Sequence, residues 1–242
     1  MKNYFQFKQF SIRQDRCAMK VGTDGVLLGA WGCVEGRRIL DIGTGTGLIA
    51  LMAAQRNPEA TVLGIDIDEE AVRQARENIA ESPFCERVRC ELLDAMELRP
   101  TEWASGQCEQ GFDAILCNPP FFTEDTLPED KGRAMARNNR SMPFAELVPK
   151  VASLLREGGS FSVIIPSQLA TDFISLCLAE NLHLQRRCQV RTTAKKPPRR
   201  VLLCFAKGNG HRTSDDVQEM CLLADDGSRS QAYMALTKDF YL

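Results

Sequence analysis

The sequence predicts an α/β fold, a doubly wound sheet of seven strands that is mostly parallel with an antiparallel last strand. Two observations lead to this prediction. Apolar runs of strand length alternate with longer helical patterns, which is typical of βαβ units. The last two apolar runs, residues 182–190 and 200–206, have no helix between them, so one strand must reverse direction. No repeat or long linker divides the chain, and a single domain over residues 1–242 is expected.

Composition narrows the class of protein. Hydrophobic residues make up 44% of the chain and charged residues 26%, the profile of a soluble globular protein. No apolar run approaches the ~20 residues of a membrane span, and residues 1–16 lack the apolar core of a signal peptide. The 10 cysteines are scattered, without a Cys-x-x-Cys pair or a histidine cluster. We therefore expect a cytoplasmic protein with no metal site and no disulfide framework.

Residues 1–30 form an extension before the first buried strand. Alternating apolar residues around Phe10 and Ile12 predict a short strand or a hairpin arm. Thr23 or Asp24 is then expected to cap a helix that ends near Trp31.

The first buried strand, residues 38–42, leads into a glycine-rich turn, Gly43-Thr44-Gly45-Thr46-Gly47, and an apolar helix. Glycines let the backbone approach a ligand closely, and the helix N-terminus offers free N–H groups. The G-x-G-x-G spacing differs from the G-x-G-x-x-G of a dinucleotide site. With Asp41 just before it, the turn is a candidate ligand cradle.

Acidic residues end the next two predicted strands. Residues 61–65 are followed by Asp66-Ile67-Asp68, and residues 87–93 by Asp94-Ala95. An acid after the second strand is where a ribose hydroxyl pair is held. We expect Asp66 to take that role and Asp68 to cap the helix over residues 69–80. Asp94 suits the amine of an adenine, and a plain surface turn is the alternative.

The fourth strand, residues 112–117, ends in Asn118-Pro119-Pro120-Phe121. Two prolines fix two φ angles, and the first favours an extended Asn118, so the turn is stiff. The amide oxygen and a proline carbonyl can accept both hydrogens of a planar NH2 group, while Phe121 or Phe122 stacks on its ring. The nitrogen lone pair then points at an electrophile, and no general base is required. A strand end that simply turns is the alternative.

The rest of the chain completes the sheet and adds a basic segment. A polar stretch, residues 124–142, is predicted to be a loop over the site. After it we expect a strand at residues 161–165 with one helix before it and one helix after it. The net charge is only −2, but residues 181–214 contain no acidic residue. A basic face of this kind suits phosphate backbones. The residues expected to contact such phosphates are Arg186, Arg187, Lys195, Lys196, Arg199 and Arg200.

Together these strand ends resemble the class I S-adenosylmethionine-dependent methyltransferases that modify amines, and the resemblance covers most of the chain. Residues 19–31, 196–203 and 236–242 are more closely similar to the bacterial valine-tRNA adenine-N6 methyltransferase family. The resemblance implies a Rossmann-like domain in which residues 1–30 pack over the cofactor site. It also implies methylation of the adenine amine beside the anticodon, on a base flipped into the pocket.

The resemblance assigns roles to particular residues. Those implied to be catalytic are Asn118, Pro119, Pro120 and Phe121. Those implied to bind S-adenosylmethionine are Thr23, Asp24, Asp41, Gly43, Gly45, Gly47, Asp66, Ile67, Asp94, Ala95 and Asn118. The expected partner is tRNA, with no DNA, membrane or metal, and the expected state is a monomer. The alternatives are methylation of another amine, either a base of ribosomal RNA or a protein glutamine, and an RNA-binding module without a cofactor. A nicotinamide dehydrogenase is disfavoured by the glycine spacing.

Overall fold

The computed structural model describes residues 4–15, 20–99, 111–120, 143–208 and 217–242. The loop expected over residues 124–142, together with Phe121 and Phe122, lies outside these ranges.

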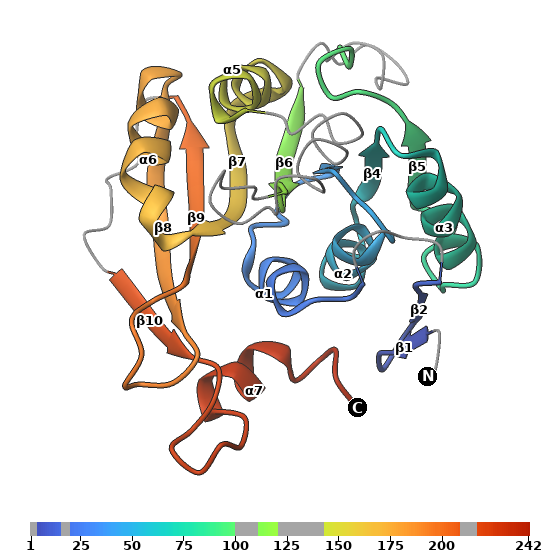
Figure 1. Ribbon diagram of the computed structural model, residues 1–242. Coiled ribbons are helices and arrows are strands. Elements are labelled where there is room, and N and C mark those ends of the chain that lie inside the picture. Colours follow the sequence, from blue (N-terminus) through green and yellow to red (C-terminus); the bar gives the residue numbers. More distant parts are fainter. Residues whose placement is uncertain (1–3, 16–19, 100–110, 121–142, 209–216) are drawn as a thin grey trace, which may run out of the picture.

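The centre of the protein is a sheet in the order β10-β8-β9-β7-β6-β3-β4-β5 (Figure 1). Its strands are β3 (Arg38–Ile42), β4 (Thr61–Asp66), β5 (Val88–Leu92), β6 (Phe112–Cys117), β7 (Leu155–Pro166), β8 (Leu182–Arg191), β9 (Arg200–Lys207) and β10 (Val217–Cys221). All neighbours are parallel except β9, which runs antiparallel to both β7 and β8. The mostly parallel sheet with its reversed strand is therefore confirmed.

The expected count of seven strands is wrong, because the described residues form eight in this sheet. The additional strand, β10, pairs in parallel with β8 at the edge of the sheet. Its five residues have the burial pattern of an edge strand, with Met220 as the buried member. A segment that buries so little has no apolar run, and the sequence therefore gives no strand signal there.

Helices cover both faces of the sheet (Figure 1). Alternate strand residues point to opposite faces, so Ile39 packs in one hydrophobic cluster and Leu40 in the other. The first cluster includes α1 (Thr23–Trp31), α2 (Leu48–Arg56), α3 (Glu69–Ala80) and α7 (Gln231–Thr237). The second includes α5 (Phe144–Leu154) and α6 (Ala170–Ala179), which follows the short 3-10 helix η2 (Ser167–Leu169). This two-sided covering is the doubly wound arrangement.

The two terminal segments pack against each other. Strands β1 (Tyr4–Gln6) and β2 (Ser11–Arg13) form the expected hairpin. The Phe7 ring stacks on Tyr241 with centroids 5.9 Å apart, and the Lys8 N–H donates to the Phe240 carbonyl at 2.8 Å. The aromatic residues near the C-terminus therefore serve to anchor the hairpin.

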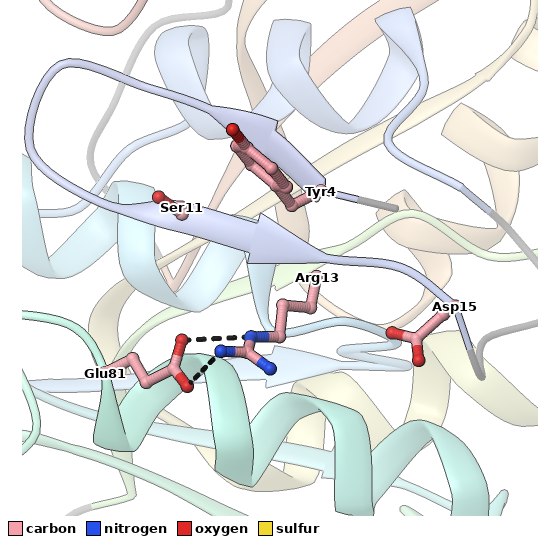
Figure 2. A pocket seen from close by; sticks show the side chains of 5 residues that line it. All are labelled: Tyr4, Ser11, Arg13, Asp15 and Glu81. Atoms are coloured by element: carbon pink, nitrogen blue, oxygen red, sulfur yellow. Dashed lines mark hydrogen bonds and ion pairs between the residues drawn. The ribbon is translucent and has the colours of Figure 1, made fainter. Parts of the chain in front are cut away.

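The hairpin also lies against α3 (Figure 2). The Arg13 guanidinium pairs with the Glu81 carboxylate at 2.7 Å. A cavity of about 410 Å³ opens at this junction and is lined by Tyr4, Ser11, Arg13, Asp15 and Glu81. It includes no residue of the glycine turn, so it is separate from the strand ends described next.

Candidate active site

The glycine turn and Asn118 leave adjacent strands at the same edge of the sheet. Ile42, the last residue of β3, lies opposite both Cys117 of β6 and Ile65 of β4. From β3 the chain winds outward through β4 and β5, and β6 then returns to the other side of β3. The gap between β3 and β6 is therefore a topological switch point, where ligands bind in open α/β sheets.

The glycine turn is held open toward this edge. Gly43 and Gly45 have φ angles of 70° and 55°, which only glycine adopts without strain. A Cβ atom at either position would meet no atom within 4 Å among the described residues. Backbone N–H groups of Gly43 and Thr44 donate to the Ile65 carbonyl at 2.9 and 3.0 Å. The turn is thus fixed to β4 on one side, with open space beside its glycines.

The turn ends at Gly47, the N-cap of α2, whose φ is 82°. A Cβ there would lie 3.5 Å from Ala75 of α3, so Gly47 also packs helix against turn.

Asp41 lies fully buried beneath the turn. Its Oδ2 accepts hydrogen bonds from Thr44 Oγ1 at 2.7 Å and from the Ala50 N–H at 3.1 Å. Its Oδ1 is also buried and has no partner among the described residues. Burial raises the pKa of Asp41 to about 7, against the effect of these two donors. A buried oxygen without a donor is costly, and this one fits a ligand that supplies an N–H group.

Asp66 ends β4 and contacts the turn directly. One carboxylate oxygen accepts the Gly45 N–H at 2.9 Å, and the other accepts the Asp68 N–H at 3.0 Å. Burial raises the pKa of Asp66. Since each carboxylate oxygen has about two acceptor positions, both retain capacity for a pair of hydroxyl groups. Asp68 instead caps α3 by accepting the Glu70 N–H at 2.9 Å, as expected.

The next strand ends supply an apolar surface beside Asp66. Ile67 is 46% exposed although it is a large aliphatic residue. Asp94 accepts the Met96 N–H at 2.9 Å within its own turn, and Ala95 is buried. An exposed isoleucine beside a turn carboxylate is suited to a planar ring that carries an amine.

Asn118 follows β6 directly and is partly exposed, between the buried Cys117 and Pro119. Its side-chain amide has no hydrogen-bond partner among the residues that the structure describes. Pro120 is exposed. The amide oxygen is therefore able to accept a hydrogen bond from a ligand at the switch point.

The expected capping of α1 by Thr23 or Asp24 is wrong. Gly22 is the N-cap residue and its extended backbone supplies no side-chain cap. The Asp24 carboxylate instead accepts from Nε of Arg200 at 2.7 Å. A charge-assisted hydrogen bond is about twice as strong as a neutral one, which explains why the carboxylate turns to the guanidinium. Arg200 lies opposite Pro166, so this pair joins α1 to the same edge of the sheet.

The six basic residues divide into two groups. Because β8 and β9 are antiparallel, the turn between them also lies at this edge. It carries three exposed basic side chains, those of Lys195, Lys196 and Arg199. Arg186 is half-buried, with its guanidinium 4.1 Å from the Trp31 ring and donating to the Trp31 carbonyl at 3.0 Å. Arg187 is also half-buried, and Arg200 is paired as described above.

Sequence reasoning missed Asn78. Its Nδ2 donates to the Thr46 carbonyl at 2.9 Å, so a residue of α3 holds the glycine turn. Ala71, Gln74, Ala75 and Asn78 recur at i, i+3, i+4 and i+7, and all are buried. The amides of Gln74 and Asn78, at the spacing of the apolar face of this helix, are the sequence signal from which the contact could have been predicted.

Within the described ranges, no group of three or more His, Cys, Asp or Glu residues is arranged to hold a metal ion. No described helix is long and apolar enough to cross a membrane.

Comparison with known proteins gives matches that span the chain. Residues 34–220 match a family model described as a methyltransferase domain. A tRNA1(Val) (adenine(37)-N6)-methyltransferase from Phocaeicola vulgatus is 44% identical, with 99% of this chain and 97% of that protein covered. Proteins of the same name from Bacteroides thetaiotaomicron and Escherichia coli O157:H7 are each 40% identical, with 99% and 100% of this chain and 97% and 96% of those proteins covered.

Solved structures show the same fold. A predicted O-methyltransferase from Agrobacterium tumefaciens aligns with a TM-score of 0.67 at 18% identity, over 90% of this chain and 96% of that one. A class I S-adenosylmethionine-dependent methyltransferase from Listeria monocytogenes aligns with a TM-score of 0.54 at 13% identity, over 88% of this chain and 65% of that one.

Proposed function

The chain belongs to the tRNA1(Val) (adenine(37)-N6)-methyltransferase family, and we propose that it transfers the methyl group of S-adenosylmethionine to N6 of adenine 37 in tRNA1(Val). The observation that carries this proposal is the side-by-side position of the glycine turn and Asn118 at the switch point. One strand end suits the cofactor, and its neighbour suits the amine that receives the methyl group.

The residues at this edge fit S-adenosylmethionine. The open glycine turn admits a ligand close to its backbone. The buried Oδ1 of Asp41 lacks a donor, and the ammonium of the cofactor is a donor of the right charge. We assign the ribose hydroxyls to Asp66, and the adenine to Ile67, Asp94 and Ala95. Bound there, S-adenosylmethionine supplies an electrophilic methyl group on a sulfonium.

Asn118 orients the target amine. Its side-chain oxygen accepts one N6 hydrogen, and the carbonyl of Pro119 or Pro120 accepts the other. With both hydrogens held, the lone pair projects out of the plane of the base. The stiff double-proline backbone keeps the two acceptors in place, and most of the rate then comes from positioning and exclusion of water. We assign Phe121 to stacking on the target base. We assign Thr23 and Asp24, at the start of α1, to contacts with the cofactor.

The tRNA contact follows from the basic turn. Adenine 37 must leave its stack to reach Asn118, and a base in a single-stranded loop does so at low cost. Lys195, Lys196 and Arg199 are exposed at the same edge and are suited to the phosphates of that loop. Arg186 and Arg200 instead contact the two ends of α1, at Trp31 and Asp24. We further propose a single-domain monomer that acts in the cytoplasm, where tRNA is found.

The test uses purified protein, S-adenosylmethionine with a labelled methyl group, and a tRNA1(Val) transcript. The expected product is N6-methyladenosine at position 37, and a transcript with guanine at that position should remain unlabelled. Ribosomal RNA and release-factor protein serve as competing acceptors in the same assay. Label in either of those, with the tRNA unlabelled, would overturn the assigned substrate while leaving the methyltransferase chemistry intact.

A further inference from the structure

Two cysteine thiols far apart in the sequence meet just past the C-terminal end of α1. Cys33 follows α1 and Cys204 lies in β9, 171 positions later. Their sulfur atoms are 3.0 Å apart, only about 1 Å more than the ~2.05 Å of a disulfide bond. Both are free cysteines. The contact therefore places one end of α1 against the centre of the sheet, with the two sulfur atoms close to bonding distance.

The surroundings fix one of these thiols and leave it accessible. The Cys33 N–H donates to Ser162 Oγ at 2.9 Å, which anchors the backbone against β7. Nη1 of Arg186 lies 3.7 Å from the Cys33 sulfur. Cys33 is partly exposed, whereas Cys204 is 2% exposed. An oxidant therefore meets Cys33 first, and Cys204 lies directly behind it.

The charges around the pair favour a thiolate at Cys33. A hydrogen bond from the Cys204 thiol, aided by the Arg186 guanidinium and opposed by burial and by Glu35, lowers the pKa of Cys33 to about 6. The pKa of Cys204 is raised in turn, so Cys204 keeps its proton. Arg56 lies near enough to interact with the Cys33 charge as well. By contrast, burial raises the pKa of Cys90 to about 12 and that of Cys188 to about 11.

We propose that Cys33 and Cys204 form a modification site that two-electron oxidants of the hydroperoxide class convert to a disulfide. The Cys33 thiolate attacks one peroxide oxygen, the O–O bond breaks, and a sulfenic acid forms with release of hydroxide. Cys204 gives its proton to that hydroxide, which becomes the first water, and its sulfur displaces the sulfenic oxygen as a second hydroxide. That hydroxide takes up the proton that Cys33 released to solvent on ionising and becomes the second water. In total, two thiols and one hydrogen peroxide give one disulfide and two waters.

The new bond would link α1 to β9 and close a very long loop of the chain. A disulfide that closes a long loop restricts the unfolded chain more than a short one does. The oxidised protein should therefore melt several degrees higher than the reduced protein. The glycine turn, Asp66 and Asn118 are not part of the linkage, so the proposal is independent of the assigned substrate.

The first test treats the intact protein with about one equivalent of hydrogen peroxide, blocks the remaining thiols with N-ethylmaleimide and maps peptides by mass spectrometry. The expected product is a Cys33–Cys204 linked peptide that dithiothreitol releases. Cys85→Ser, which removes an exposed cysteine outside the pair, should form the same link. Sulfinic or sulfonic acid at Cys33 without a link to Cys204 would overturn the proposal.

A second test does not depend on oxidation. The rate of Cys33 alkylation by iodoacetamide, measured against pH, should reach half its maximum near pH 6. In Cys204→Ala, which loses a single buried methyl-sized contact and the donated hydrogen bond, the midpoint should move up toward the ordinary thiol pKa of ~8.5. A midpoint above pH 8 in the parent protein would contradict the proposal, since Cys33 would then hold no thiolate to begin the reaction.

Discussion

The side chain of Asn78 donates a hydrogen bond to the Thr46 carbonyl at 2.9 Å, so a helix residue holds the second half of the glycine turn. The same amide also donates to the Arg13 carbonyl at 3.0 Å and accepts the Arg13 N–H at 2.8 Å. Asn78 is 1% exposed. One buried amide therefore joins the terminal hairpin, α3 and the candidate cofactor cradle.

Replacing Asn78 should damage both the fold and cofactor binding. Asn78→Ala leaves backbone groups of Thr46 and Arg13 without partners, which costs about 1–3 kcal/mol for each buried group. We expect a lower free energy of unfolding in urea and weaker binding of S-adenosylmethionine by calorimetry, because the turn is less well held.

Glu81→Gln is the matched control for this change. It removes the Arg13–Glu81 ion pair of the same junction, whose side chains are 53% and 52% exposed. Exposed pairs contribute about 0–1 kcal/mol, so stability and cofactor affinity should hardly change. Equal effects of the two substitutions would show that the hairpin contact, and not the hold on Thr46, is what matters.

The buried Asp41 should make stability depend on pH. Its pKa is raised to about 7 in the folded protein, against ~3.9 in an unfolded chain. Between these values the folded chain keeps a proton that the unfolded chain has lost, so stability falls as pH rises from about 4 to about 7. The fall attributable to Asp41 is on the order of 4 kcal/mol.

Asp41→Asn removes this titration. The free energy of unfolding, measured in urea at several pH values, should decline less steeply for the variant than for the parent protein. Parallel curves would mean that Asp41 titrates normally. The variant should also bind S-adenosylmethionine more weakly at pH 8, since the neutral amide cannot balance the ammonium of the cofactor.

Asp66 should contribute to cofactor binding and not only to the turn. Asp66→Ala leaves two ribose hydroxyls without an acceptor, and we expect affinity for S-adenosylmethionine to fall by about 1–3 kcal/mol. Asp68→Ala is the control, because it removes the cap of α3 at a cost of about 1 kcal/mol in stability without touching the cofactor. Calorimetric titration of both variants separates the roles, and an unchanged affinity in Asp66→Ala would reduce Asp66 to a turn residue.

The basic turn should bind phosphates. Replacing Lys195, Lys196 and Arg199 by Ala should weaken tRNA binding and lower the slope of log K against log salt by roughly one unit per lost contact. Cofactor affinity should be unaffected. Arg200→Ala should behave differently, because it breaks the Asp24 pair and lowers the melting temperature. Identical salt slopes for the triple variant and the parent protein, in filter binding, would argue against a phosphate-binding turn.

The position of the candidate site residues at one edge of the sheet was predictable, because each strand end carries its own signal. Gly43, Asp66 and Asn118 each follow an apolar run, and parallel strands bring their carboxyl ends to one edge. The sequence does not show which groups each of these side chains contacts in the folded protein. The basic run suggested a single RNA-binding face, yet Arg186 stacks on Trp31 and Arg200 pairs with Asp24. Such contacts join residues more than 150 positions apart and appear only once the chain has folded.

Sequence reasoning missed the edge strand β10 and the buried amide of Asn78 for different reasons. Strand β10 buries too little apolar surface to produce a periodic pattern. Asn78 lies at the helical spacing of the buried face of α3, but asparagine is mostly a surface residue, and the sequence does not show which backbone groups its amide contacts.

The central claim is that Asn118 holds the amine that receives the methyl group. Asn118→Ala removes one acceptor and leaves the prolines, the glycine turn and Asp66 in place, so cofactor binding should survive. The lost contact matters most as the nitrogen becomes tetrahedral, which makes it mainly a transition-state interaction. The measurement is single-turnover methylation of tRNA1(Val) with enzyme and cofactor saturating. We predict a rate lower by about 10²-fold or more with a smaller change in tRNA affinity, and a rate equal to that of the parent enzyme would contradict the account.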